Sequence, residues 1–325
     1  MSADKQEAKD LMIRPQILKM LLKDRTTGKN IIWGTNNYKS RVKGYQPKDY
    51  IEFCMVSGKS RSFVKPRTSK SEAEQKKRSK DMAEVFTPSW IVNIQNNVVD
   101  ARWFGHDGAF NIEGENDWIP TDKVVFEESK DWKQYVEDTR LEITCGEAPY
   151  LTSRYDATSG EPIEIKKRIG LLDRKLRVIG ENALDESEWK EWAIKAMKSV
   201  YGFDFQGDNV LLARENVFLD VMEYYKDRFG KDADEDFEEE AADVISWNIF
   251  QMDGMKYVVP YSCHIEHGGQ LRFDFFTGET VEPEPVECPG CQTGDAAKHN
   301  GTYARIMDWK KNKSVKFLDV LMGRK

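Results

Sequence analysis

The sequence predicts an α/β protein with a largely parallel sheet, a helical insertion and a small β-rich C-terminal part. Strand-like and helical stretches alternate over residues 81–260, as expected when helices cover the faces of a parallel sheet. After Pro260 the pattern changes to short β-like runs, QLRFDFF, TYARIMDW and SVKFLDVL, between Gly, Pro and Cys turns. We therefore expect a helix, a strand and a basic linker in residues 1–80, the α/β domain in 81–260 and the β-rich region in 261–325.

The composition is that of a globular protein with a sizeable core. The 325 residues are 39% hydrophobic and 32% charged, as is typical of packed rather than disordered chains. No apolar run approaches the roughly 18 residues of a membrane span, and the N-terminus MSADKQEAKD is too polar for a signal peptide. We expect a cytoplasmic protein without a membrane partner.

Charge is unevenly distributed along the chain. The net charge of −7 argues against indiscriminate coating of nucleic acid, because such binding depends on Lys and Arg displacing counterions. Residues 59–80 nevertheless carry nine Lys or Arg against two Glu, whereas residues 232–240 are almost wholly acidic. The basic segment is expected to be a solvated, flexible linker, and contact with phosphate is the alternative.

Two regions outside the strand ends carry clear local patterns. The first 58 residues predict an amphipathic helix over roughly 7–23, followed by a buried strand in GKNIIWGTNNY. Residues 164–200 contain two helical periodicities, the second opened by the acidic start LDESEW. We therefore expect a helical insertion between the first two strands of the α/β domain.

The stretch RLEITCGEAPYL has the form of a ligand-binding strand end. A short strand, 141–144, is followed by a turn in which Gly146 and Ala148 let a ligand approach the main chain. In open α/β sheets ligands lie beyond the carboxyl ends of the strands. The alternative is a glycine turn with nothing bound.

Two further strands are expected to end in carboxylates. Asp204 follows the strand predicted at 200–203, and Asp208 or Asn209 can cap the helix after it. Asp253 follows the strand predicted at Ile249 and Phe250. An acidic side chain at a strand tip commonly binds ribose hydroxyls in nucleoside-binding folds, and the alternative is an ordinary polar strand-end residue.

Four motifs in this order resemble those of one enzyme family. They are AEVFTPSWIVNIQNNVVD, LEITCGEAPYL, VYGFDFQGDNVLLAREN and NIFQMDGM, which together span roughly residues 81–256. They are similar to motifs of the N6-adenine DNA methyltransferases that serve as modification subunits of bacterial restriction-modification systems. The resemblance implies a Rossmann-like class I methyltransferase sheet, S-adenosylmethionine as cofactor, and DNA as partner. A restriction or specificity subunit, or a second copy of the chain, is the further partner it implies.

The same resemblance implies roles for ten residues. By it, the Phe-Thr-Pro segment would close over the cofactor, Glu142 and the turn after the first strand would line its methionine part, and the two strand-end acids would bind the ribose and the adenine. In that order these residues are Phe86, Thr87 and Pro88; Glu142, Cys145, Gly146, Glu147 and Ala148; Asp204; and Asp253. The alternative for EVFTP is a helix start with proline in its first turn.

The family's methyl-acceptor motif is missing from the sequence. That motif is Asn or Asp, two prolines and an aromatic residue, and it binds an adenine flipped out of the duplex. Two degenerate substitutes are Asp308 with Trp309, and Asn37 with Tyr38, each with a simple turn or hairpin edge as alternative. The catalytic residues therefore stay unassigned. The alternative function is a catalytically degenerate methyltransferase-fold protein that acts as a binding or regulatory partner in restriction or phage counter-defence.

The C-terminal region offers ligands for zinc. Cys288-Pro-Gly-Cys291 has the turn of a zinc ribbon, and Cys263 and His299 complete a tetrahedral set, with His264 or His267 as alternative ligands. We expect a structural zinc site here. Free thiols are the alternative reading.

Overall fold

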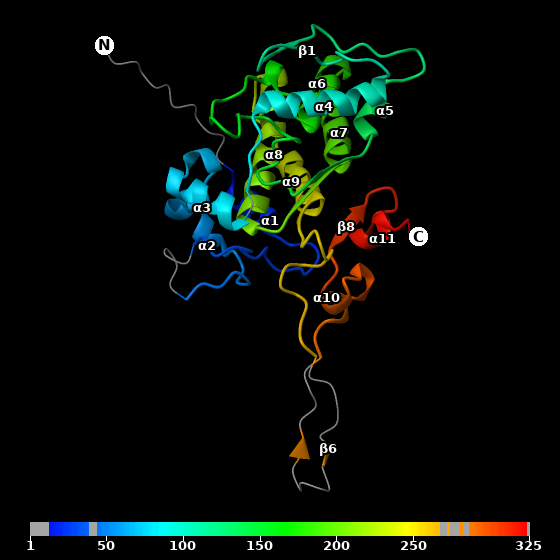
Figure 1. The fold of residues 1–325 in the computed structure, drawn as a ribbon. Coiled ribbons are helices and arrows are strands. Elements are labelled where there is room, and N and C mark those ends of the chain that lie inside the picture. The colour runs from blue at the N-terminus through cyan, green and yellow to red at the C-terminus, as the bar shows by residue number, and fades with distance from the viewer. Residues whose placement is uncertain are drawn as a thin grey trace, which may run out of the picture.

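The computed structural model describes residues 13–38, 44–82, 84–266, 272–273, 280–281 and 286–323. Figure 1 shows helices α4 to α9 gathered into one body, with α1 to α3 beside it and the C-terminal elements below. The helices are α1 Pro15–Leu21, α2 Phe53–Val56, α3 Glu72–Met82, α4 Ser89–Phe104, α5 Trp132–Glu137, α6 Leu171–Asn182, α7 Glu186–Lys198, α8 Gly207–Phe229, α9 Glu235–Asn248, α10 Pro289–Thr293 and α11 Phe317–Leu321. The strands are β1 Asn111–Glu113, β2 Trp118–Pro120, β3 Arg140–Ile143, β4 Val200–Asp204, β5 Ile249–Gln251, β6 Arg272–Phe273, β7 Thr280–Val281, β8 Arg305–Asp308 and β9 Lys313–Lys316.

Three parallel strands form the central sheet in the order β3–β4–β5. Leu141 lies opposite Tyr201, and Phe203 lies opposite Phe250. The side chains of β5 are all buried, whereas the edge strand β3 exposes Leu141 and Ile143. The prediction of a mixed α/β protein with a parallel sheet is therefore confirmed, and small antiparallel pairs accompany the sheet.

The connections between these strands are helical. The predicted insertion after β3 is present as α6 and α7, and α8 and α9 connect β4 to β5. Helix α7 packs against α6 and α9, and α8 packs against α6, α9 and β5. Two of these helices begin at aspartate caps, because Asp185 accepts a hydrogen bond from Glu188 N (2.9 Å) and Asp234 accepts one from Phe237 N (2.9 Å).

The N-terminal segment docks on the sheet through a glutamine side chain. Gln251 Nε2 donates to Ile32 O (2.8 Å), while its Oε1 accepts from Ile32 N (2.9 Å). Next to this contact, Gly207 N donates to Trp33 O (2.7 Å), and a Cβ at Gly207 would lie 1.8 Å from Ile32 O. The strand predicted in GKNIIWGTNNY forms only isolated bridges, such as the one between Ile32 and Tyr50, and the Gln251 side chain takes the N–H and C=O of Ile32 on the other edge.

The basic segment folds instead of acting as a linker. Residues 59–80 contribute to two short 3₁₀ turns, Gly58–Phe63 and Arg67–Ser69, and to α3. In α3 the buried Arg78 donates through Nε and Nη2 to Glu84 (2.8 and 2.7 Å) and through Nη1 to Asp208 (2.6 Å). Two buried carboxylates thus hold the segment against α8.

The terminal regions match the predictions in part. Helix α1 begins at Pro15, and residues 7–12 of the predicted helix lie outside the described residues. Of the predicted β-like runs, TYARIMDW contains β8 and QLRFDFF contains β6, but SVKFLDVL divides into β9 and α11.

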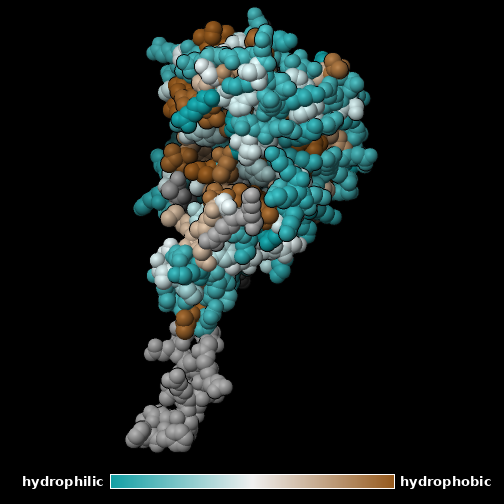
Figure 2. Space-filling view, turned by 90° about the vertical axis from the view of Figure 1, so that its right-hand side faces the viewer, coloured by the Kyte–Doolittle hydropathy of each residue, from teal (hydrophilic) through white to brown (hydrophobic). Residues whose placement is uncertain are grey.

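The molecular surface on the face drawn in Figure 2 is mostly hydrophilic, with hydrophobic residues gathered mainly toward one edge. None of the helices in the described part of the chain is both long enough and apolar enough to cross a membrane.

We expect Arg78→Met to lower the free energy of unfolding by about 3–5 kcal/mol, because it leaves Glu84 and Asp208 buried without their cation. Urea denaturation followed by circular dichroism measures this change. Lys76→Met, on the same helix but with an 83% exposed side chain, is the matched control and should change stability by less than about 0.5 kcal/mol. Equal effects of the two substitutions would contradict the role given to Arg78.

Candidate functional site at the carboxyl ends of the strands

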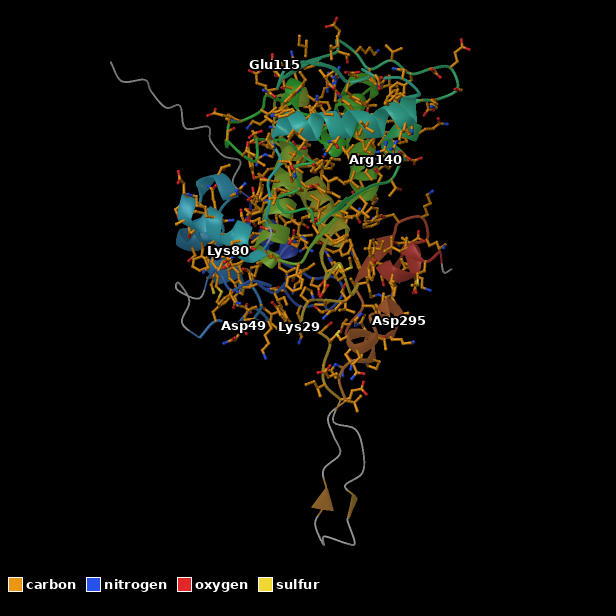
Figure 3. All side chains as sticks on the ribbon, viewed as in Figure 1. Lys29, Asp49, Lys80, Glu115, Arg140 and Asp295 are labelled. Atoms are coloured by element: carbon orange, nitrogen blue, oxygen red, sulfur yellow. The ribbon has the colours of Figure 1, made fainter. Side chains whose placement is uncertain are left out.

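A pocket of about 860 Å³ lies at the carboxyl ends of β3 and β4. Its walls come from the segment before α4, from α4, from the turn after β3 and from the β4–α8 connection. We call it the strand-end pocket. Its volume lies within the roughly 300–1,000 Å³ of small-molecule sites. Arg140, the first residue of β3, is labelled in Figure 3 and locates the strand that leads to it.

The turn after β3 has an unusual backbone. Thr144, Gly146 and Ala148 all have positive φ, at 48°, 53° and 62°. For Thr144 and Ala148 this left-handed conformation is uncommon and costs energy. The turn thereby presents the Gly146 main chain at the pocket wall, and Gly146 N donates to Asp204 Oδ2 (2.9 Å).

Asp204 is fixed at the end of β4 by two backbone donors. Its Oδ2 accepts from Gly146 N (2.9 Å) and its Oδ1 from Gln206 N (2.8 Å). Burial raises the pKa of Asp204 to about 6, although these two hydrogen bonds act in the opposite direction. Each oxygen retains a further lone pair that can accept a hydrogen bond from a ligand.

Glu142 is a second buried carboxyl group on the pocket wall. It accepts hydrogen bonds from Tyr150 N (3.3 Å) and Leu151 N (3.1 Å). Burial nevertheless raises the pKa of Glu142 to about 8. At neutral pH the side chain is therefore mostly protonated, and a cationic ligand would favour its ionised form.

The segment before α4 supplies the aromatic part of the wall. Phe86 is nearly buried, and the guanidinium carbon of Arg67 lies 4.8 Å from its ring centroid. Thr87 also lines the pocket, whereas Pro88 is the N-cap residue of α4. Helix α4 is held at this end by Ser89 N, which donates to Asp156 Oδ2 (2.7 Å).

The ten residues that the motif resemblance singled out fall into two groups. Those that line the strand-end pocket are Phe86, Thr87, Glu142, Cys145, Gly146 and Asp204. Those that do not line it are Pro88, Glu147, Ala148 and Asp253. Glu147 points away from the pocket. Its carboxylate instead accepts hydrogen bonds from Arg67 N (2.6 Å) and Tyr155 Oη (2.7 Å).

Gln206 is a pocket residue that the sequence analysis did not identify. Its side chain lines the strand-end pocket and is only 5% exposed. Within the described part of the chain its Oε1 has no hydrogen-bond partner, and a buried acceptor of this kind is costly unless a ligand or water satisfies it. The sequence signal is only its position two residues after Asp204.

Asp253 lines a neighbouring pocket of about 400 Å³. We call this the cysteine-side pocket, since Cys263, Cys288 and Cys291 also line it. Phe205 contributes to both pockets and lies between them. A ligand that contacts both Asp204 and Asp253 would therefore have to extend past Phe205.

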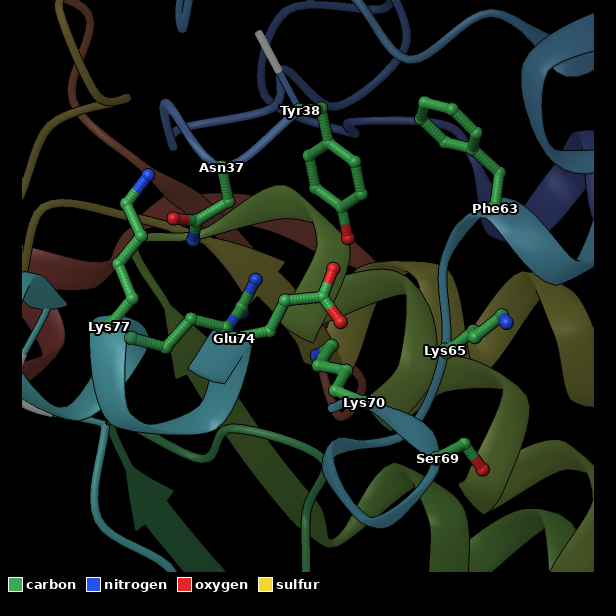
Figure 4. Close-up of a pocket in the computed structure, with 9 residues that line it drawn as sticks. Asn37, Tyr38, Phe63, Lys65, Ser69, Lys70, Glu74 and Lys77 are labelled. Carbon is green, nitrogen blue, oxygen red and sulfur yellow. The ribbon is translucent and has the colours of Figure 1, made fainter. Parts of the chain in front are cut away.

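Asn37 and Tyr38 lie in a third pocket, of about 160 Å³, which Figure 4 shows together with its lysine side chains. The Tyr38 ring stacks on Phe63, with centroids 5.1 Å apart, and its hydroxyl donates to Asp208 Oδ2 (2.8 Å). Although burial opposes it, Arg78 lowers the pKa of Asp208. The Tyr38 hydroxyl is thus used in a hydrogen bond that holds the N-terminal segment to α8.

Asp308 and Trp309 belong to the β8–β9 turn. Asp308 Oδ1 accepts from Lys310 N and Lys311 N (3.1 Å each), and Trp309 Nε1 donates to Asn248 Oδ1 (2.9 Å). Neither residue lines the strand-end pocket. Both pairs of substitute acceptor residues therefore lie outside it.

The predicted zinc ligands are brought together beside α10. Cys263 Sγ, Cys288 Sγ, Cys291 Sγ and a ring nitrogen of His299 lie within 4.8 Å of one another, so this cluster can hold a metal ion. His264 is exposed and outside the cluster, and His267 lies outside the described residues.

The chain therefore combines a pocket lined by buried carboxyl groups with a separate thiol–imidazole cluster. Carboxyl groups and an aromatic wall suit a ligand with hydroxyl donors and positive charge. No protein-family model, curated protein or solved structure matches the chain.

Proposed function

We propose that the strand-end pocket binds S-adenosylmethionine and that the chain is the cofactor-binding component of an N6-adenine DNA methyltransferase. The observation that carries this proposal is the convergence of Phe86, Gly146 and Asp204 on one cavity. These residues come from three separate motifs, each of which resembles a cofactor motif of the same family.

The chemistry of the cofactor matches the pocket walls. The ribose offers two hydroxyl donors, and the Asp204 carboxylate at the pocket wall can accept hydrogen bonds from them. The sulfonium carries a positive charge, which Glu142 and the aromatic face of Phe86 can stabilise. The Gly146 turn brings main chain close to the methionine part.

Methyl transfer needs an acceptor site for the adenine amine, and we propose that a partner chain supplies it. None of Asn37, Tyr38, Asp308 and Trp309 lines the strand-end pocket. Leu141 and Ile143 of the edge strand β3 are exposed and line this pocket, so a partner could cover the edge and complete the site. The chain would position the sulfonium methyl in line with the amine nitrogen.

A second candidate function is a catalytically degenerate methyltransferase-fold protein that acts as a binding or regulatory partner. The same observation favours it, because neither of the two substitute methyl-acceptor pairs lines the pocket. Both candidates require S-adenosylmethionine to bind, but only the first requires DNA to become methylated.

Adenine-N6 methylation of cellular DNA distinguishes these two functions. We expect N6-methyladenine when the chain is expressed together with the genes that flank its own, little when it is expressed alone, and none with Asp204→Ala. Mass spectrometry of digested DNA measures it. Cofactor binding without methylation under either condition would support the degenerate protein instead.

Asp204→Ala should weaken S-adenosylmethionine binding by about 10- to 100-fold, the effect of losing hydrogen bonds to a charged group. Isothermal titration calorimetry measures the Kd. Asp308→Ala is the matched control, because that carboxylate caps a turn outside the pocket. If wild-type protein does not bind the cofactor, or if both variants bind it alike, the proposed pocket assignment is wrong.

Binding of S-adenosylmethionine should release protons at pH 7. Glu142, with its pKa raised to about 8, is mostly protonated at that pH, and a bound cation lowers the pKa of a facing carboxyl group. The release should fall to about a tenth at pH 9, where Glu142 is already mostly ionised.

Calorimetry in two buffers of different ionisation enthalpy counts these protons. S-adenosylhomocysteine, which lacks the sulfonium charge, is the control ligand and should release fewer. Identical heats in the two buffers at pH 7 would show that Glu142 does not respond to the cofactor's charge.

A further inference from the structure

The thiol–imidazole cluster has the dimensions of a tetrahedral zinc site. His299 Nδ1 lies 3.6 Å from Cys263 Sγ, 3.5 Å from Cys288 Sγ and 3.8 Å from Cys291 Sγ. A tetrahedron with Zn–S of about 2.3 Å and Zn–N of about 2.0–2.1 Å places nitrogen and sulfur roughly 3.5–3.6 Å apart. All three distances lie close to this value, although the four residues come from three separate segments.

Two glycines allow the ligand residues of the cluster to approach one another closely. A Cβ at Gly290 would lie 2.6 Å from the His299 ring, and a Cβ at Gly301 would lie 2.9 Å from Cys263 N. Asn300 N donates to Cys288 Sγ (3.3 Å), the kind of second contact that orients a thiolate ligand. Pro289, the first residue of the short helix α10, lies between the two ligands Cys288 and Cys291.

The position of the histidine is fixed independently of the sulfurs. His299 N donates to Tyr303 Oη (3.0 Å), and Tyr303 Oη donates to Ala296 O (2.8 Å). Asp295, labelled in Figure 3, caps the turn before it by accepting from Ala297 N (2.9 Å). The imidazole is therefore held with Nδ1 toward the three thiols.

We propose that Cys263, Cys288, Cys291 and His299 bind one structural zinc ion through three Sγ atoms and Nδ1. Four protein ligands leave no open position, so the ion would be structural and not catalytic. Three thiolates and one neutral imidazole give the zinc site a net charge of −1, and Lys256, beside Cys291, offsets it.

The zinc ion would link two segments of the chain, the one that contains Cys263 and the one that contains Cys288. Cys263 precedes Glu266 and Cys288 follows Val286, and these two residues form an antiparallel bridge with both backbone hydrogen bonds (2.8 and 2.9 Å). The ion would lie a few residues from this bridge along both segments. By joining Cys263 to Cys288 the ion would close the loop between them, and this removes conformational freedom that the bridge between Glu266 and Val286 alone could not remove.

Metal analysis of the full chain tests this assignment. Protein purified without chelator under reducing conditions should retain one zinc per chain, and modification of its thiols with a mercurial reagent should release that zinc in step with modification of the three cluster cysteines. Cobalt exchanged into the site should give the absorption bands of a tetrahedral, thiolate-rich centre. These measurements use the unaltered protein and do not depend on how a variant folds.

Two pairs of matched variants complete the test. Cys288→Ser and His299→Ala should lose most of the bound zinc, whereas Cys54→Ser and His264→Ala, at exposed positions outside the cluster, should retain it. Folded wild-type protein that retains no zinc after growth in zinc-supplemented medium would overturn the proposal. Equal zinc loss in the control variants, or retention of a different metal, would overturn it as well.

Discussion

The buried Arg78 guanidinium is the contact on which the shape of the strand-end pocket depends. It forms ion pairs with Glu84, in the segment that leads to Phe86, and with Asp208, in the first turn of α8. Arg78 also donates to Asn209 Oδ1 (3.1 Å). A buried charge without its partner costs several kcal/mol, so α3, the aromatic wall and the start of α8 have to move together. The distance between Phe86 and the end of β4 is thereby fixed.

Helix α8 explains why acidic residues gather at this end of the sheet. Its N-terminus begins at Gly207, directly behind β4, and the helix dipole favours negative charge there. Asp204 stands just before this helix, and its two oxygens accept hydrogen bonds from Gly146 N and Gln206 N. The same carboxylate therefore holds the β3 turn in place and lies at the pocket wall.

Local sequence patterns predicted the parts of the site that depend on neighbours along the chain. The β3 turn, the acid after β4 and the Cys-x-x-Cys knuckle each follow from a few consecutive residues. The residues that sequence analysis missed depend on contacts between distant segments. Arg78 lies in a stretch whose composition indicates a solvated linker, and it folds because Glu84 and Asp208 become buried with it. Likewise, the IIW stretch has strand composition, but on one edge the side chain of Gln251, far away in the sequence, takes the backbone hydrogen bonds of Ile32.

Asp253 follows its predicted strand but lies in a different pocket from Asp204. It follows β5 as predicted, but the chain turns at once, and Asp253 pairs with Val258, which in turn pairs with Tyr303 of the C-terminal part. Asp253 thus belongs to the wall that carries the cysteine cluster, and Phe205 separates it from the strand-end pocket. The two acids are held by different supports, Asp204 by the β3 turn and Asp253 by the C-terminal region. The affinity of a ligand that contacted both acids would depend on whether the metal cluster is formed. The affinity of a ligand confined to the strand-end pocket would not.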